Sequence, residues 1–449
     1  MASSAPDLIT GVSAADALLF LHRARPEAYP VLLETAAQLP GQPSHSLLLA
    51  GPGECLVLRG DGRLEGPGRG CSFLARLDDW WRTAKAPPPG QIPFAGGWFL
   101  LLGYELAGEI EPVLRLPRDP RACVAVAWRM RAAIWHEHGS GRTGFVAEPG
   151  QEALLFRMRA DLAAARGAPP AVGPLALAVS EDDAAQYLAA VEQALGHIAA
   201  GDVYQANLSR RWHGRLRPGV TAADVYARLR RSNPAPFAGL ADLGRLAVAS
   251  SSPERLVRVR DRVIETRPIA GTRPRGQGED RHTICELVGH PKERAEHVML
   301  IDLERNDLGR LCKPGSVRVD EYMTVESYAH VHHIVSNVRG ELVEGATPAD
   351  VIRALFPGGT ITGCPKVRCM QLIAELEGRP RGLYTGAMGY LAGDGSMDLN
   401  ILIRTISIQN GHADLRAGAG IVADSKPLRE LEETRAKARG VLRALTEAG

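Results

Sequence analysis

Four glutamates in the second half of the chain have spacings that would let them act together. Glu293 and Glu296 lie three residues apart in one predicted helix, and Glu430 and Glu433 lie three apart in the predicted C-terminal helix. Residues at this spacing share one face of a helix. Either pair alone is typical of a solvated charged face, with Glu433 paired to Lys437. Together the carboxylates could form a cage of the hard oxygen ligands that suit Mg²⁺, and the spacing leaves both interpretations open.

Three histidines, His330, His332 and His333, form a second polar cluster. Alternate residues of a strand face the same side, so His330 and His332 would point together and His333 would point away. This pattern argues against three convergent metal ligands. It favours a single histidine facing a site, with a packed or solvated histidine as the ordinary alternative.

Two glycine-rich segments match nucleotide-binding loops only in part. Gly418–Ala423 fits GxGxxA, but β-type sequence follows it, whereas the dinucleotide fingerprint leads directly into a helix. Gly358–Lys366 lacks the GK[ST] ending of a phosphate loop. We therefore do not predict a nicotinamide, flavin or ATP site. The backbone N–H groups of Gly418 and Gly420 could instead bind a carboxylate.

The composition bounds the class of protein that must position these residues. The chain has 449 residues, 45% hydrophobic and 23% charged, which suits a soluble globular protein with a large core. Its formal net charge is +2, so it lacks the broad positive field that favours nucleic-acid binding. Among its 53 basic residues, lysine occupies only positions 85, 292, 313, 366, 426 and 437. A mechanism that needs a lysine must find it at one of these positions.

Cysteine usage and the N-terminal sequence favour the cytoplasm. The seven cysteines are scattered and include no CxxC pair, which argues against a disulfide framework or a structural zinc site. The N-terminal sequence does not resemble a signal peptide, and no apolar run reaches the roughly 18 residues of a membrane helix. We expect a cytoplasmic protein that binds neither membrane nor nucleic acid.

The order of predicted elements indicates an α/β protein. Residues 1–170 contain short β-type runs separated by turns such as Gly51-Pro52-Gly53, followed by a helix over 151–166. A Pro- and Gly-rich segment at 167–174 is typical of a linker or long loop. The main elements predicted beyond it are a helix from Ser180 to Gly201, strands over 246–250, 255–260, 262–265, 386–391 and 400–409, and helices over 291–302 and 427–445.

Motifs in the second half resemble, in order, those of the chorismate-utilising enzymes. That family includes anthranilate synthase component I, aminodeoxychorismate synthase component I, and isochorismate and salicylate synthases. Residues 1–170 resemble its variable N-terminal portion only loosely. The matching segments are GDVYQANLS at 201–209, SSPER at 251–255, ETRPIAGTRPR at 265–275, RAE at 294–296, DLERNDLGR at 302–310, VHH at 331–333, FPGGT at 356–360, IRT at 403–405 and the glycine-rich segment at 418–425.

The resemblance implies one large α/β unit with two packed β-sheets, helices outside and the active site between the sheets. Residues 1–170 would form the N-terminal portion of this fold, and residues 171–449 the catalytic, chorismate-binding portion. It also implies Mg²⁺ held by Glu296 and Glu433, with Glu293 and Glu430 nearby through water. The ion would bind the ring carboxylate of chorismate and act as a Lewis acid.

The same resemblance implies roles for further residues. Glu254 would be the general acid that protonates the departing 4-hydroxyl, and His333 and Thr360 would complete the catalytic group, with His333 facing the ring. Arg404 would pair bidentately with the pyruvyl carboxylate. The remaining implied substrate contacts are the backbone donors of Gly418 and Gly420, together with Tyr384, Lys437, Gly271 and Thr272.

The residue at position 205, a glutamine, indicates whether water or ammonia attacks the ring of chorismate. Isochorismate and salicylate synthases carry, at the corresponding position, a lysine that activates water, and an amide cannot act as a general base. Ammonia is therefore favoured. It can add at ring position 2 with loss of pyruvate, as in anthranilate synthase, or at position 4 without that loss, as in aminodeoxychorismate synthase.

Local sequences favour the second branch, with one departure. SPER at 252–255, VHH at 331–333, the glycine pair at 358–359 and NPAPF at 233–237 resemble aminodeoxychorismate synthases, which serve 4-aminobenzoate and folate synthesis. Leu32–Thr35 and Asn233–Ala238 depart from the tryptophan-sensing pocket of anthranilate synthases. Ala270, however, is typical of anthranilate synthases, since aminodeoxychorismate synthases carry a lysine there. We weigh the surrounding motifs more heavily and expect 4-amino-4-deoxychorismate, with anthranilate synthase or a 2-amino-2-deoxyisochorismate synthase as the alternative.

Ammonia implies a partner. Members of the family take it from a glutamine amidotransferase, and the sequence contains no Cys-centred GxCxG elbow of such a domain. We therefore expect a separate amidotransferase subunit. A chorismate-binding protein without turnover is the alternative of a different class, and the intact Glu254, Glu296 and Glu433 argue against it.

Overall fold

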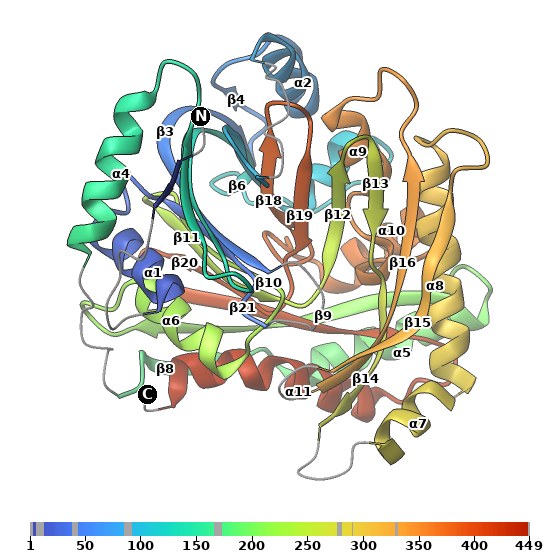
Figure 1. Ribbon diagram of the computed structural model, residues 1–449. Helices are drawn as coiled ribbons and strands as arrows, with labels where there is room; N and C mark the ends of the chain where they lie inside the picture. The colour runs from blue at the N-terminus through green and yellow to red at the C-terminus, as the bar shows by residue number, and fades with distance from the viewer. Residues whose placement is uncertain are drawn as a thin grey trace.

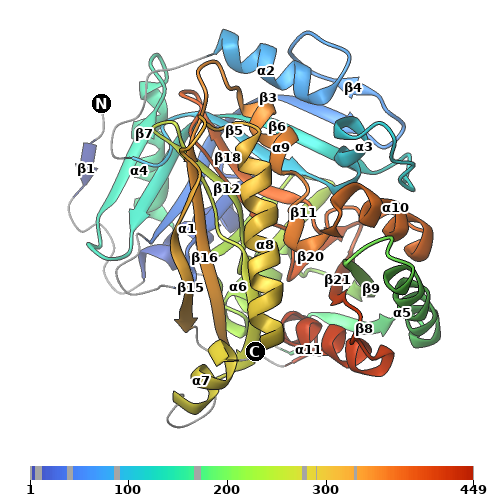
Figure 2. The ribbon, with the colours of Figure 1, turned by 90° about the vertical axis from the view of Figure 1, so that its right-hand side faces the viewer.

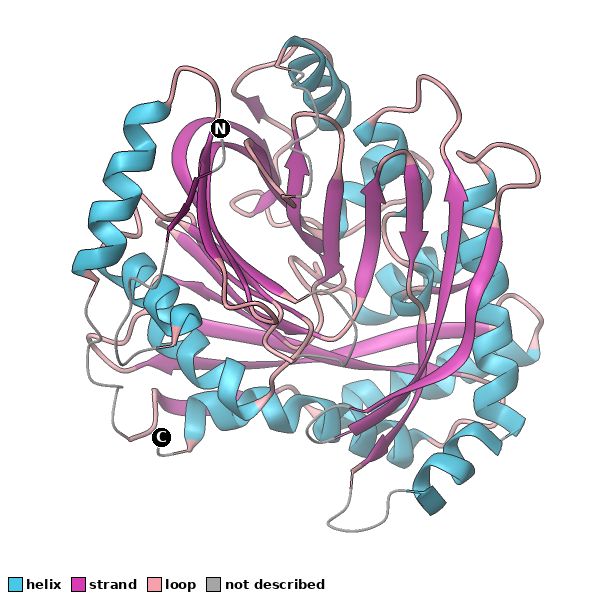
Figure 3. Ribbon diagram, in the orientation of Figure 1, coloured by secondary structure: helices cyan, strands magenta, loops and turns pink. Residues whose placement is uncertain are grey.

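The strands of the protein form two β-layers with helices outside them (Figures 1 and 3). The computed structural model describes residues 3–5, 13–37, 44–84, 92–165, 173–275, 281–289, 291–327 and 331–447. Its strand pairs, all antiparallel where described, join into one continuous hydrogen-bonded network. The predicted α/β class, with packed β-layers and flanking helices, is confirmed.

The first layer starts at β5 and continues through strands from the second half of the chain. Successive hydrogen-bonded neighbours define its order. The strands are β5 (Gly97–Leu102), β18 (Ala387–Ala392), β19 (Met397–Ile401), β12 (Arg255–Arg260), β13 (Val263–Thr266) and β16 (Val331–Glu341), with β14 (Ile269–Pro274) and β15 (Arg318–Ser327) also paired to β16.

The second layer crosses the first, as the directions of β9 and β12 in Figure 1 show. Its order likewise follows from successive pairings. The strands are β2 (Val31–Glu34), β10 (Phe237–Asp242), β11 (Leu246–Ser252), β20 (Thr405–Gln409), β21 (His412–Ile421) and β9 (Gln205–Leu216), with β8 (Ala176–Glu181) and β17 (Gly363–Cys364) on β9, and β1 (Ser3–Ala5) beside β7 (Thr143–Ala147).

Two long strands belong to both layers. β3 (His45–Arg59) and β6 (Cys123–Glu137) pair along their whole length, with a register shift between Pro52 and Cys55. The early part of β3 also pairs with β2, its late part with the short β4 (Leu64–Glu65), and the first half of β6 pairs with β5. The predicted turn at Gly51-Pro52-Gly53 is therefore wrong. The segment is a bulge that bends one strand, with Gly51 at φ +63°, and it lets the strand continue from one layer to the other.

Alternation along the central strands divides the core into an inner and an outer part. Phe99 and Leu101 of β5 pack between the layers with Leu47 and Leu49 of β3. Leu100 and Leu102 point to the opposite face, into a cluster under the helices. Successive residues of a strand face opposite sides, so the fully apolar β5 is buried on both faces.

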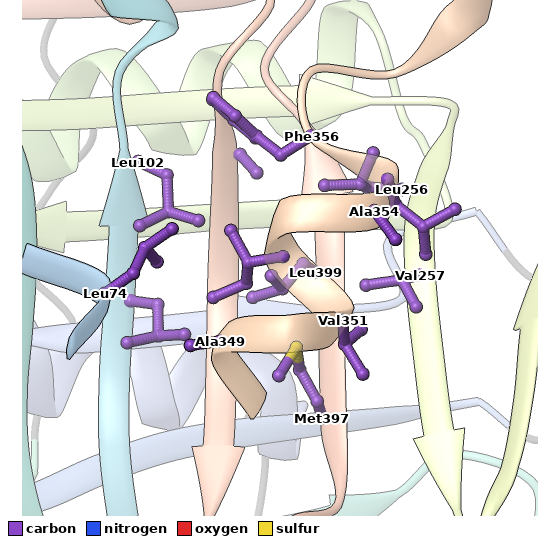
Figure 4. Close-up of a cluster of buried hydrophobic side chains, with 14 of the residues drawn as sticks. Leu74, Leu102, Leu256, Val257, Ala349, Val351, Ala354, Phe356, Met397 and Leu399 are labelled. Carbon is purple, nitrogen blue, oxygen red and sulfur yellow. The ribbon is translucent and has the colours of Figure 1, made fainter. Parts of the chain in front are cut away.

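Helices cover the outer faces of both layers (Figure 2). Figure 4 shows part of the outer cluster of the first layer, where Val351 and Ala354 lie against Leu256 and Leu399. The first layer carries α2 (Phe73–Thr83), η1 (Tyr104–Leu106), α3 (Ala107–Ile110), α8 (Pro291–Gly309) and α9 (Pro348–Leu355), with α7 (Arg281–Gly289) preceding α8. The second carries α1 (Ala14–Ala24), α4 (Glu152–Ala164), α5 (Ala184–Ala199), α6 (Ala222–Ser232), α10 (Lys366–Glu377) and α11 (Pro427–Thr446).

Two further predicted boundaries differ from the structure. The helix expected to start at Ser180 begins at Ala184, because Ser180 belongs to β8 and the Asp183 side chain caps the helix by accepting the Ala185 N–H. The predicted helix over 291–302 continues to Gly309. Most of the predicted linker at 167–174 lies outside the described residues.

Candidate active site

Glu254 lies where the chain passes from the second layer to the first. β11 ends at Ser252 and β12 begins at Arg255, so the link of two residues changes layers. The Glu254 carbonyl accepts the N–H of Ile401 at 3.0 Å. This hydrogen bond ties the link to the end of β19 and holds the Glu254 backbone in place.

The environment of the Glu254 carboxyl suits an acid that works near neutral pH. The Thr360 hydroxyl, on the short helix η2 (Gly359–Ile361), donates to it at 2.7 Å. Burial raises the pKa of Glu254 to about 7, although the Thr360 hydroxyl, the Ile269 N–H and the charges of Arg404 and Lys437 act in the opposite direction. The group is therefore partly protonated at neutral pH and could give a proton to a leaving oxygen.

Arg404 lies at a second crossover beside the first. β19 ends at Ile401 in the first layer and β20 begins at Thr405 in the second, so the strand predicted over 400–409 is two strands with a break. Arg404 adopts φ +51° in this break, a conformation that side-chain-bearing residues rarely take. Its carbonyl accepts the Ser251 N–H at 3.2 Å. The two crossovers thus hold the acid and the predicted carboxylate-binding cation next to each other.

His333 is buried on β16 and its Nδ1 lies 3.4 Å from the carbonyl oxygen of Gly271. Burial, and then the charge of Arg404, lowers the pKa of His333 to about 3. The imidazole is therefore neutral at physiological pH. His332 is also buried, with Nδ1 2.7 Å from the Ser327 hydroxyl, while the prediction for His330 lies outside the described residues.

The predicted metal ligands lie in two pairs on two helices. Glu296, near the start of α8, is half-buried and accepts the Gln205 Nε2–H at 3.1 Å. Burial, followed by the charges of Glu293 and Glu433, raises the pKa of Glu296. Because like charges from both helices act on one carboxylate, a bound cation would relieve their repulsion.

The second pair is partly neutralised by the protein itself. Glu433 on α11 forms an ion pair with Lys437 at 2.7 Å, and Lys437 Nζ also donates to the Gly418 carbonyl at 3.1 Å. Within the described part of the chain, no three Asp, Glu, His or Cys side chains are close enough together to enclose a metal ion. In chemical type the carboxylates of Glu296 and Glu433 fit Mg²⁺, which proteins often bind through one or two carboxylates while the ion keeps several waters.

The predicted glycines of β21 are required by close approach. A Cβ on Gly418 would lie 2.6 Å from the Leu208 carbonyl oxygen and 2.7 Å from the Tyr384 hydroxyl, and one on Gly420 would lie 2.3 Å from Gln205 Nε2. From Arg416 onward β21 pairs with β9 alone among the described strands. The backbone of this stretch can therefore face a ligand on its other edge.

The Tyr384 hydroxyl lies beside Gly418 and can donate a hydrogen bond. We call these two residues the Gly418–Tyr384 wall. Burial raises the pKa of Tyr384 to about 12, so its hydroxyl keeps its proton at neutral pH. Gly271, on β14, adopts φ +66°, and a Cβ there would lie 2.8 Å from Glu293 Oε2. The prediction for the Thr272 side chain lies outside the described residues.

A buried acid near Glu254 was missed by the sequence analysis. Glu304, on α8, is 5% exposed, and burial raises its pKa to about 7, with a further contribution from the charge of Glu254. The charges of Lys366 and Asp307, which form an ion pair at 2.5 Å, also act on it. The segment 302–310 contains five charged residues, and its sequence alone does not distinguish the buried Glu304 from the exposed charges around it.

The segments that differ from the tryptophan-sensing pocket also come together. Leu33, Thr35, Pro236 and Ala238 line a cavity of about 330 Å³ between β2, β10 and the first layer. Arg255 and Asp398, which form an ion pair at 3.0 Å, lie in its wall. Glu254, Thr360 and Arg404 do not line this cavity.

Comparison with known proteins identifies the family. A family model described as chorismate binding enzyme matches residues 69–443. The chain belongs to this family. An anthranilate synthase component I-like protein of Synechocystis sp. is 43% identical over 371 residues, covering 80% of this chain and 74% of the relative. Aminodeoxychorismate synthase component 1 of Bacillus subtilis is 41% identical over 389 residues, covering 83% and 82%.

A solved structure of the family has the same fold. The crystal structure of anthranilate synthase component I from Streptococcus pneumoniae superposes with a TM-score of 0.80 at 31% identity, covering 90% of this chain and 93% of that one. The two relatives from Synechocystis sp. and B. subtilis are nearly equally identical to this chain, yet one is named after anthranilate synthase and the other after aminodeoxychorismate synthase. The chorismate binding enzyme described here also has, within its described residues, no helix of the length and apolar character needed to span a bilayer.

Proposed function

We propose that this chorismate binding enzyme replaces the 4-hydroxyl of chorismate by ammonia to give 4-amino-4-deoxychorismate. The observation that carries the proposal is the buried Glu254 carboxyl, which receives a hydrogen bond from Thr360 at 2.7 Å and has a pKa of about 7. A displaced hydroxide is a poor leaving group unless it is protonated as it departs. Glu254 is the acid that serves this step.

The remaining residues bind and orient the substrate. Arg404 pairs with one substrate carboxylate, and the backbone of Gly418 and Gly420, with Tyr384 and Lys437, binds the rest. Neutral His333 packs against the ring without adding charge. These contacts hold the scissile C–O bond toward Glu254.

The carboxylates on α8 and α11 hold Mg²⁺ in this proposal. Glu296 and Glu433 would hold the ion, with Glu293 and Glu430 as further acidic side chains nearby. When bound, the ion supplies a Lewis acid for the ring carboxylate and a partner for the substrate's negative charge. Burial raises the pKa of Glu296, and the charges of Glu293 and Glu433 raise it further, which supports the use of these three side chains.

Gln205 supports ammonia over water as the nucleophile. Its amide donates to Glu296 at 3.1 Å and has no proton-accepting nitrogen with which to activate water. In the proposed step ammonia forms the C–N bond at ring carbon 4 as the C–O bond breaks. Glu254 gives its proton to the departing oxygen, which leaves as water, and the new ammonium group then loses a proton to restore the acid.

Anthranilate synthesis is the second candidate, and Ala270 is the observation that favours it. Ala270 is buried on β14 opposite Ile334, so this position offers no nucleophilic side chain for a covalent step. Direct substitution at carbon 4 does not need one, because the acid and a positioned substrate suffice. A related 2-amino-2-deoxyisochorismate synthase would add ammonia at position 2, as anthranilate synthase does, but would stop before pyruvate loss.

Product analysis separates these candidates. The enzyme is incubated with chorismate, Mg²⁺ and an ammonium salt, with and without added aminodeoxychorismate lyase. We expect 4-aminobenzoate only when lyase is present. Anthranilate formed without lyase would replace the proposal by the second candidate. No Mg²⁺-dependent consumption of chorismate would leave a binding protein without turnover.

We also propose that a separate glutamine amidotransferase subunit supplies the ammonia. The relative from B. subtilis is named as a component 1, which supports a second component here. Glutamine should then drive the reaction only after that subunit is added, whereas ammonium salts should drive it alone. Glutamine-driven turnover by the isolated chain would contradict this assignment.

A further inference from the structure

A buried charged network lies directly behind the Gly418–Tyr384 wall. Glu377 ends α10, and Gly378 follows in the left-handed conformation at φ +60°, which terminates the helix. The chain then returns so that Arg381 Nη2 donates to Glu377 Oε1 at 2.6 Å. Arg416, from the neighbouring strand β21, donates to Glu377 Oε2, also at 2.6 Å. One carboxylate therefore holds two guanidinium groups from different elements.

The network is almost inaccessible to water. The side chains of Glu377, Arg381 and Arg416 are 4%, 1% and 8% exposed. The charges of both arginines lower the pKa of Glu377 despite its burial, so it is ionised. A second buried carboxylate, Glu105, accepts the Arg381 backbone N–H at 2.7 Å, so acids face this network from two sides. Buried charges are retained only where their surroundings compensate them.

Both arginines contact the ring of Tyr384. The guanidinium carbons of Arg381 and Arg416 lie 5.5 and 5.9 Å from the centre of that ring. These cation–π contacts fix the ring in the geometry in which its hydroxyl meets Gly418. The ring position thus depends on the two guanidinium groups, whose positions depend on Glu377.

The same network holds an acceptor beside that donor. Arg381 Nη2 donates to the Asn207 backbone carbonyl at 2.5 Å, and Glu377 Oε1 accepts the Ser209 N–H at 2.9 Å. These bonds fix the part of β9 that faces Gly418. The Asn207 side-chain oxygen is buried there without a hydrogen-bond partner among the described residues, 2.7 Å from where a Cβ on Gly418 would lie. A buried acceptor of this kind is expected to bind a ligand donor.

We propose that Glu377 is a positioning residue for substrate binding, acting through Arg381 and Arg416 on Tyr384 and Asn207. It does not contact the substrate itself. It sets a donor and an acceptor at Gly418, so that both are in place before a substrate binds. The inference rests on the proposed use of Tyr384 and Gly418 as substrate contacts.

A double-mutant cycle tests the proposal. Glu377→Gln keeps the side-chain volume but turns an amide N–H toward a guanidinium group, so one arginine loses its partner. We expect the KM for chorismate to rise about tenfold with kcat changed less than about threefold, because a binding contact is loosened. In the Tyr384→Phe background, Glu377→Gln should raise KM by much less, since the hydroxyl it positions is already absent.

Control variants keep the outcome decisive. Glu148→Gln disrupts a comparable arrangement remote from the site, in which Glu148 holds Arg129 at 2.5 Å and Arg129 lies 4.6 Å above the Trp98 ring. It should leave KM unchanged. If Glu377→Gln does not fold, as judged by thermal unfolding, Arg416→Lys replaces it, because lysine keeps the charge but loses the planar fork.

Two results would overturn the inference. One is an unchanged KM in Glu377→Gln (or in Arg416→Lys if that variant replaces it); the other is the same rise in KM with and without the Tyr384 hydroxyl. Both require an active wild type. Absence of Mg²⁺-dependent chorismate consumption by the wild type would instead contradict the proposed function, so the two failures are distinguishable.

Discussion

Glu254 and Arg404 occupy adjacent crossovers between the two β-layers, and two backbone hydrogen bonds tie the crossovers together. The Ser251 N–H donates to the Arg404 carbonyl at 3.2 Å, and the Ile401 N–H donates to the Glu254 carbonyl at 3.0 Å. The two residues that carry the proposed acid and the proposed carboxylate-binding cation therefore lie on segments whose backbones are held together. Such a site needs little rearrangement to align a substrate between its two groups.

Glu254→Gln should reduce kcat by about 10²- to 10⁴-fold, the range typical of a lost general acid. Binding of chorismate should remain measurable by calorimetry, because glutamine keeps the shape of the side chain. Glu148→Gln serves as the control and should retain activity. Turnover of Glu254→Gln close to that of the wild type would remove Glu254 from the mechanism.

The Thr360 hydroxyl should set the alkaline limb of the pH profile. Its hydrogen bond lowers the pKa of Glu254, which burial holds at about 7, so activity that needs the protonated acid should fall as the pH rises above about 7. Thr360→Val removes this donor and should move the limb of kcat/KM to higher pH. Thr362→Val is the control, because Thr362 donates to the Gly358 carbonyl and not to Glu254. If the alkaline limb of Thr360→Val stays at the pH of the wild type, as is expected for Thr362→Val, the assignment is contradicted.

The free energy of unfolding should also depend on pH through the Glu254 carboxyl. The raised pKa of Glu254 means that the folded state holds its proton more tightly than the unfolded state does. Its contribution is fully present below pH 4.5 and is lost as the pH rises to about 7. The free energy of unfolding of Glu254→Gln, measured by urea denaturation, should therefore fall less than that of the wild type over this interval. Equal slopes would show that Glu254 is ionised at lower pH than proposed.

Removal of the metal should abolish turnover, and the α8 carboxylates should set its affinity. We expect EDTA to stop chorismate consumption and added Mg²⁺ to restore it. Glu296→Gln should raise the Mg²⁺ concentration for half-maximal activity by about tenfold or more. Asp302→Asn, on the same helix but 65% exposed and paired with Arg305, is the matched control. An unchanged Mg²⁺ requirement in Glu296→Gln would argue against this ligand.

Gly418→Ala should damage both binding and stability. The added methyl group would lie 2.6 Å from the Leu208 carbonyl oxygen, so the strand or the Tyr384 hydroxyl must move. Overpacking of this kind costs about 1–3 kcal/mol in unfolding free energy. Gly196→Ala, where no heavy atom lies within 4 Å of the new Cβ, should instead leave the protein equally or more stable. A Gly418→Ala variant with wild-type stability and KM would show that the close approach is not needed.

Local patterns predicted well those elements that local forces determine. The C-terminal helix, predicted over 427–445, is observed as Pro427–Thr446, since its apolar spacing and its proline start act within the segment. Gly51-Pro52-Gly53 resembled a turn because its bulge depends on pairing with β6, far along the chain. The break in the strand at Arg404 could likewise not be predicted from the local sequence, because it arises where the chain passes from one layer to the other.

The site was predictable where a motif carried it and not where burial decided the role. Glu254 and Arg404 came from segments that resemble a family, and the structure places both at the crossovers. Glu377 and Arg416 carry no local sign of their contact, because a single carboxylate joining a helix end to a strand is a tertiary feature. The burial of Glu304 could not be predicted for the same reason, because exposed charged residues of α8 surround it in the sequence.

The bend of β3 at Gly51-Pro52-Gly53 has a consequence for how such enzymes diversify. Because β3 and β6 run through both layers, and β5 and β2 pair with β18 and β10 of the second stretch, the two stretches of sequence share backbone hydrogen bonds. Removing the N-terminal 170 residues would sever those bonds and expose strand edges, and an exchanged segment would have to match the register of each shared pairing. New specificities in this scaffold should therefore arise by substitutions within loops and cavities rather than by the shuffling of modules.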